Sequence, residues 1–171
     1  MNNIDRILVP VDFSACSQAA CEHAAQIALR FGAVVELLHV WDVPAFSGAI
    51  LPEVFTSAPS ADDESVAGFV QKRATKAMEA MVADLERRGV VGVRRRLEMG
   101  DPTTAIVKVA EEGRFSLIVM GTHGRRGFSR LLLGSVAEKV VRIAPCPVLT
   151  VRVPDEPTET TTPVTVEEAI L

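Results

Sequence analysis

Glycine, serine and arginine are concentrated between Met120 and Val136, a stretch that reads MGTHGRRGFSRLLLGSV. Glycine has no Cβ, so it lets backbone amides approach a ligand closely and tolerates positive φ. If a helix opens at Ser135, its first amides and the Ser135 hydroxyl are hydrogen-bond donors without intrahelical partners. Arg125, Arg126 and Arg130 add positive charge that could neutralise phosphate oxygens. This combination is typical of a site for a phosphate-bearing anion.

The four glycines of this stretch fit neither common phosphate-binding fingerprint. They are Gly121, Gly124, Gly127 and Gly134. The chain contains no GxxxxGK[ST] motif, and the glycine spacing differs from GxGxxG. A plainer alternative is a surface turn shaped by glycine and flanked by solvated arginines. The apolar run before the stretch and the helical pattern after it favour the phosphate site, because ligands of parallel sheets bind where strands end.

Strand-like and helical patterns alternate along the chain. Short apolar runs predict five strands, over residues 4–11, 33–40, 93–99, 116–120 and 148–153. The helices between them begin and end at recognisable residues. Ser14 and Asp101 are suitable N-caps, Gly32 is a suitable stop, and Pro102 suits a first helical turn. Ser135 and Glu138 have the spacing of a capping box.

This alternation predicts an α/β fold, a doubly wound five-stranded parallel sheet with helices on both faces. The charged strand at 93–99 is expected near a sheet edge. Residues 42–61 read as a long irregular excursion. The following segment reads as a long helix whose apolar face carries Ala67, Val70, Ala74, Ala77, Met81 and Leu85. His39 lies in an apolar strand and is interpreted as a core histidine with a hydrogen-bond partner.

Composition narrows the possible functions. Five of the 22 acidic residues lie in residues 154–171, so the remainder carries 17 acidic residues against 18 basic ones. A nearly neutral body without tyrosine argues against nucleic-acid binding. No apolar run is long enough for a membrane span, no signal peptide is visible, and three unpaired cysteines indicate a reducing, cytoplasmic setting. We expect one domain over residues 1–153 and a disordered acidic tail over 154–171.

The glycine stretch resembles the ATP-binding branch of the universal stress protein family. That branch carries Gly-x2-Gly-x9-Gly-Ser/Thr, matched here by Gly121, Gly124, Gly134 and Ser135. The segments ILVPVDFS, LLHVWD, GDPTTAIVKVAEE and APCPVLTV resemble other parts of the family, and the likeness spans about residues 4–153. The resemblance implies a Rossmann-like sheet of the adenine nucleotide alpha hydrolase type, with strand order 3-2-1-4-5.

The resemblance also implies roles for individual residues. Asp12 would face the adenine and ribose, and Val40 would offer backbone groups to the adenine edge. The remaining positions would lie beside these groups or contact phosphates; they are Pro10, Val11, Met120, Gly121, His123, Gly124, Arg125, Gly134, Ser135 and Val136. Asp12 has a simpler alternative, which is to cap the helix that follows it.

These features favour a regulatory stress-response protein that binds ATP, with or without Mg²⁺, and hydrolyses it slowly at most. No nucleophile elbow, zinc signature or pair of carboxylates indicates a dedicated catalyst, so no catalytic or metal-ligating residue is assigned. Two alternatives stay open: a nucleotide-free dimeric interaction protein, and a weak ATPase or nucleotidyl-transferring enzyme. The last strand, if it forms a sheet edge, favours a homodimer. A regulatory stress-response protein is also expected to act on a protein partner.

Overall fold

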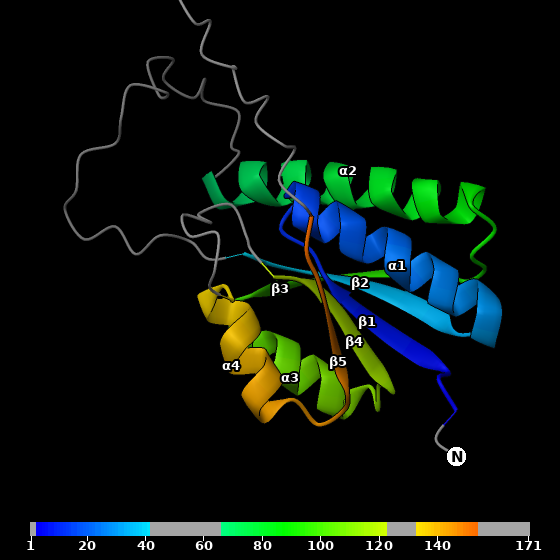
Figure 1. The fold of residues 1–171 in the computed structure, drawn as a ribbon. Coiled ribbons are helices and arrows are strands. Elements are labelled where there is room, and N and C mark those ends of the chain that lie inside the picture. The colour runs from blue at the N-terminus through cyan, green and yellow to red at the C-terminus, as the bar shows by residue number, and fades with distance from the viewer. Residues whose placement is uncertain (1–2, 42–65, 123–132, 154–171) are drawn as a thin grey trace, which may run out of the picture.

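The computed structural model describes residues 3–41, 66–122 and 133–153 (Figure 1). Five parallel strands form one sheet in the order β3-β2-β1-β4-β5. The strands are β1 (Arg6–Pro10), β2 (Val34–Trp41), β3 (Arg94–Met99), β4 (Leu117–Gly121) and β5 (Val148–Val151). The helices are α1 (Ala15–Phe31), α2 (Val66–Arg87), α3 (Pro102–Glu112) and α4 (Ser135–Ile143). The predicted fold class and strand order are therefore confirmed.

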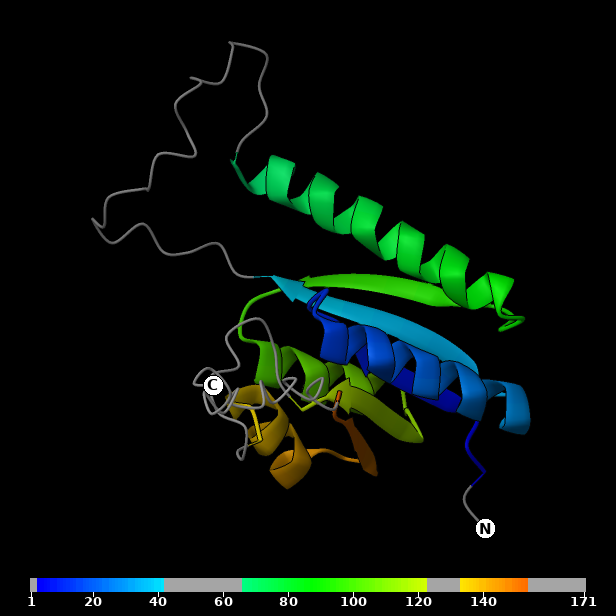
Figure 2. The same ribbon diagram turned by 45° about the horizontal axis from the view of Figure 1, so that its top comes forward.

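The helices cover both faces of the sheet. Helices α1 and α2 lie on one face and α3 and α4 on the other (Figures 1 and 2). Successive side chains of a strand point to opposite faces. In β1, Ile7 and Val9 accordingly join the core beneath α1 and α2, whereas Leu8 joins the core with α3 and α4. A central strand buried on both sides reads as a continuous apolar run, which is why β1 was recognisable.

Several helix ends form as predicted. Ser14 caps α1 and accepts a hydrogen bond from the Ser17 amide, and Gly32 ends the helix in the left-handed conformation at φ 69°. Asp101 caps α3 through the Thr104 amide at 2.9 Å, with Pro102 in the first turn. These caps are local hydrogen-bond chemistry, so neighbouring residues suffice to predict them.

The buried face of α2 differs in part from its prediction. Ala74 and Leu85 are buried as expected, but Met78 is completely buried, whereas Ala77 and Met81 are only partly so. The helix therefore presents a face slightly rotated from the predicted one. Ala67 and Val70 lie outside the residues whose side chains are described. Strands β3 and β5 are the two sheet edges, as the charged pattern of β3 indicated. The excursion at 42–61 and the tail at 154–171 lie outside the described residues.

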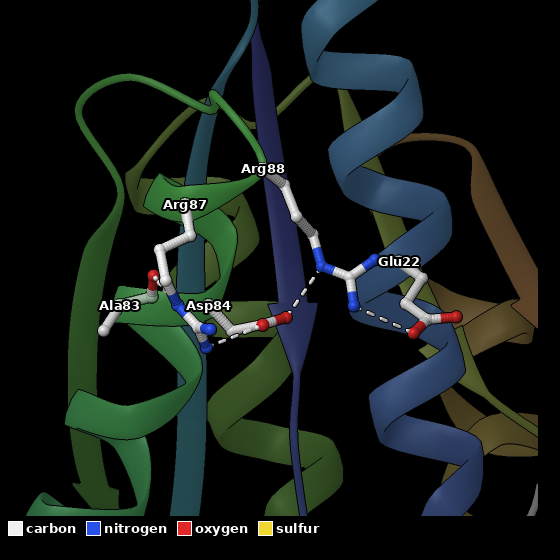
Figure 3. A network of polar contacts seen from close by, with 5 residues as sticks. All are labelled: Glu22, Ala83, Asp84, Arg87 and Arg88. Atoms are coloured by element: carbon white, nitrogen blue, oxygen red, sulfur yellow. Dashed lines mark hydrogen bonds and ion pairs between the residues drawn. The ribbon is translucent and has the colours of Figure 1, made fainter.

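An ion-pair network joins α1 to the end of α2 (Figure 3). The guanidinium of Arg88, the residue after α2, donates to Asp84 Oδ2 of α2 at 2.7 Å and to Glu22 Oε1 of α1 at 3.1 Å. Arg87 donates to the other Asp84 oxygen at 3.0 Å. All of these side chains are substantially exposed to water, so the network adds little to stability.

Cys21 lies buried beside this network and makes stability depend on pH. The pKa of its thiol is raised to about 12, first by burial and then by the carboxylates of Asp84 and Glu22. The folded protein thus keeps a proton that the unfolded chain releases near its ordinary pKa of 9.0. This contribution is fully present below pH 9 and is lost as pH rises toward 12.

We therefore expect the free energy of unfolding to fall above pH 9, by at most about 1.4 kcal/mol per pH unit from this group. Urea unfolding between pH 8 and 11 measures the slope. A Cys21→Ala variant serves as the control, because it lacks the titrating thiol and its slope should be shallower. Equal slopes in both proteins would contradict the assignment.

No helix in the described part of the chain is both long and apolar enough to cross a membrane.

Candidate functional site

Strands β1 and β4 are neighbours, but the helices that follow them lie on opposite faces. Strand β1 leads to α1 on one face, and β4 leads to α4 on the other (Figure 2). Beyond the carboxyl ends of the two strands, at Pro10 and Gly121, α1 and α4 therefore lie on opposite sides of the sheet. Such a topological switch point is where open α/β sheets bind ligands.

The turn after β1 carries Asp12. Its Oδ1 accepts hydrogen bonds from the Ser14 amide at 3.1 Å and the Ser14 hydroxyl at 2.6 Å. Ser14 in turn is the N-cap of α1. The simpler interpretation of Asp12 is thus partly right: it orders the residue that caps the helix, although it is not the cap itself. Asp12 as a whole is half-buried, just beyond the end of β1.

Two residues of strand β2 contact the turn that follows β1. The Val11 amide donates to the Leu38 carbonyl at 2.8 Å, and His39 Nδ1 lies 2.7 Å from the Val11 carbonyl oxygen. His39 is 8% exposed, which confirms that it is a core histidine with a hydrogen-bond partner. The Phe13 ring packs on the His39 ring with their centroids 4.5 Å apart.

Gly121 is required by close packing of α1 on the end of β4. A Cβ at this position would lie 2.8 Å from the Cβ of Cys16 and 2.9 Å from its carbonyl carbon. A Cβ atom essentially never comes this close to a non-bonded backbone atom. Any larger residue at position 121 must therefore displace the first turn of α1. The sequence suggested access for a phosphate as the reason for this glycine. It gave no sign of Cys16, because no sequence signal reports a contact between residues so far apart.

Helix α4 begins at Ser135, as predicted, but the predicted capping box is wrong. The N-cap is Gly134, which has no side chain to cap the helix, and Ser135 is already helical. The first intrahelical bond runs from the Glu138 amide to the Gly134 carbonyl at 2.9 Å. The amides of Ser135, Val136 and Ala137 precede that bond, and no side chain of the described residues caps this helix end.

The end of β4 ties this helix terminus to the sheet. The Gly134 amide donates to the Thr122 carbonyl at 2.7 Å, and the Thr122 amide donates to the Val151 carbonyl at 2.9 Å. The open amides of α4 therefore lie just beyond the strand end at Gly121. A helix N-terminus also carries a partial positive charge, so this position suits an anion.

The remaining predicted positions divide into three groups. Val40 is half-buried near the end of β2, and its backbone pairs in register with Glu98 of β3. Met120 is 5% exposed and its side chain belongs to the core with α3 and α4, so only its backbone is available to a ligand. His123, Gly124 and Arg125 lie outside the described residues. Within residues 3–41, 66–122 and 133–153, no cluster of three His, Cys, Asp or Glu side chains is arranged to hold a metal ion.

Residues 3–152 match the model of the universal stress protein family. The chain belongs to this family. Universal stress protein MJ0531 of Methanocaldococcus jannaschii is 38% identical over 153 residues, which cover 90% of this chain and 85% of the relative. The resemblance inferred from the glycine stretch and the segments around it is therefore confirmed at the level of the family.

Solved structures of family members share the fold. Universal stress protein UspA from Lactobacillus plantarum is 26% identical with a TM-score of 0.70, and the match covers 89% of this chain and 100% of that one. The universal stress protein from Archaeoglobus fulgidus in complex with dAMP is 21% identical with a TM-score of 0.56, covering 88% of this chain and 99% of that one. At that identity the second likeness is one of fold.

Proposed function

We propose that this universal stress protein binds ATP or a related adenine nucleotide across the carboxyl ends of β1 and β4. The observation that carries the proposal is the N-terminus of α4, which no side chain of the described residues caps and which lies beside Gly121 at the switch point. A triphosphate offers acceptor oxygens to which the amides of Ser135 and Val136 can donate. The dAMP complex of the Archaeoglobus fulgidus relative supports an adenine nucleotide as the class of ligand.

Asp12 and Val40 would hold the nucleoside end. Asp12 lies at the end of the strand next to β4, and Val40 lies near the end of the next strand across. The carboxylate of Asp12 can accept from a ribose hydroxyl, and the backbone of Val40 can pair with the adenine edge. His123, Gly124 and Arg125 would complete the phosphate side.

The proposed role is regulatory, with hydrolysis slow at most. ATP normally carries Mg²⁺, which prefers phosphate oxygens and water over a cage of protein ligands. The described residues thus need only bind the nucleotide and order it. Nucleotide binding would then bias contacts with a protein partner in the cytoplasm, as expected for a stress-response regulator.

Calorimetric titration with ATP, ADP, AMP and cyclic AMP tests the proposal. We expect saturable binding of at least one nucleotide, and binding weakened about tenfold in Asp12→Asn. Asparagine keeps an oxygen that can accept from Ser14, so this variant removes the charge while preserving the turn. Phosphate release should stay close to background. Absence of binding by all four nucleotides would overturn the proposal.

We further propose a homodimer through β5. This strand is a sheet edge, and it exposes an apolar side chain, since Leu149 is 37% exposed. An edge strand offers unpaired backbone groups to a second copy.

Replacing Leu149 with Lys is expected to convert the dimer to monomer at micromolar concentration, because charge on an edge strand opposes edge-to-edge pairing. Sedimentation velocity measures the result. Leu29→Lys is the matched control, since Leu29 is 54% exposed near the end of α1, where its side chain lies next to Gly89. A parent protein that sediments only as a monomer would contradict the dimer.

A further inference from the structure

His39 on β2 contacts the Asp12 turn from both ends. Its Nδ1 lies 2.7 Å from the carbonyl oxygen of Val11, the residue before Asp12. Its ring packs on Phe13, the residue after Asp12, with centroids 4.5 Å apart and planes inclined by 39°. A carbonyl oxygen can only accept, so Nδ1 carries the proton and donates it.

The end of β1 needs such support. Pro10 has no amide hydrogen, so it cannot donate to a neighbouring strand. The ordered backbone beyond it depends on Val11, whose amide donates to Leu38 and whose carbonyl accepts from His39. Two consecutive residues of β2 therefore bind both polar backbone atoms of Val11. A buried carbonyl that lost one of these partners would be left unsatisfied or would move.

Phe13 adds a second constraint. It has a φ of 66°, a conformation that residues with a side chain rarely adopt. Such a backbone persists only where the surroundings hold it, and held outliers of this kind are concentrated at functional sites. The His39 ring, the Val11 bond and the Ser14 bonds to Asp12 together restrain the turn on both sides of the carboxylate.

We propose that His39 is a positioning residue for nucleotide binding, acting through the Val11 carbonyl and the Phe13 ring to hold Asp12 toward the switch point. This inference rests on the proposed function. His39 itself has no contact with the nucleotide in this scheme. Its contribution is to keep the Asp12 carboxylate in place before the nucleotide arrives, which avoids the cost of ordering the turn on binding.

Two substitutions at one position separate this role from simple core packing. His39→Asn places an amide donor close to the position of Nδ1, so it can still bond the Val11 carbonyl. His39→Leu fills a similar volume without a donor. Leu85→Ala is the stability control, because Leu85 is buried near the end of α2, remote from the Asp12 turn.

We expect His39→Leu to weaken ATP binding by roughly tenfold in calorimetry, the scale of one lost hydrogen bond to a buried acceptor. His39→Asn should lose less affinity than His39→Leu, because it keeps the bond to the Val11 carbonyl and lacks only the ring contact with Phe13. Leu85→Ala should unfold at lower urea concentration and bind ATP as the parent does. Equal affinity in His39→Leu and the parent, or equal losses in all three variants, would overturn the inference.

A readout without nucleotide keeps this test separate from that of the proposed function. The Ser14 amide donates to Asp12 Oδ1, so its hydrogen exchange reports whether the turn is ordered. It should exchange faster in His39→Leu than in His39→Asn and the parent protein. If the parent binds no adenine nucleotide, the proposed function fails, and unchanged Ser14 exchange in His39→Leu would overturn the positioning role as well.

Discussion

Replacing Gly134 with Asp is expected to stabilise the fold and weaken ATP binding, two effects of opposite sign. Gly134 has φ −58° and ψ 150°, a conformation open to any residue, so the substitution brings no backbone strain. The new carboxylate would accept from the first amides of α4 and gain about 0.5 kcal/mol as an N-cap beside the helix dipole. It would also occupy the amides and repel the phosphates, reducing ATP affinity by about 30-fold.

Urea unfolding and calorimetric titration measure the two effects on the same samples. Gly134→Asn is the matched control, because asparagine caps a helix about as well and carries no charge. It should stabilise the protein similarly and lose less affinity for ATP. A Gly134→Asp variant that is stabilised yet binds ATP as tightly as the parent would show that the phosphates lie elsewhere.

Replacing Gly121 with Ala is expected to lower the free energy of unfolding by about 2 kcal/mol and to weaken ATP binding about tenfold. The added Cβ would lie 2.9 Å from the Cys16 carbonyl carbon, which is backbone and cannot rotate away. The first turn of α1 would have to shift, and the Asp12 turn that precedes it would shift too. Chemical denaturation and titration with ATP measure the two losses.

Gly92→Ala provides the same chemical change at a distant turn. Gly92 has φ 71°, and a methyl group added there would meet nothing within 4 Å, so only backbone strain of about 1 kcal/mol is expected. It lies between α2 and β3, at the opposite end of the strands from Gly121. Its ATP affinity should therefore match that of the parent. Equal losses of affinity in both variants would contradict a local effect at Gly121.

The two glycines at the ends of the predicted phosphate stretch have different physical roles. In the sequence, Gly121 and Gly134 looked alike, as sites of close approach by a phosphate. Gly121 is instead demanded by the packing of α1, whereas Gly134 leaves a helix terminus without a cap. The capping box expected at Ser135 failed because the Ser-x-x-Glu spacing does not fix which residue is the cap. A shift of one position moved Ser135 into the helix and left Gly134 before it.

The sequence by itself determined the order of strands and helices, the caps at Ser14 and Asp101, and membership of the family. These features depend on periodicity, on hydrogen bonds between near neighbours and on a recognisable motif, all of which are written within short segments. Only the tertiary structure decided that Cys16 meets Gly121 and that His39 bonds Val11. Such contacts join residues that the chain brings together through sheet order and helix packing, so no local pattern contains them.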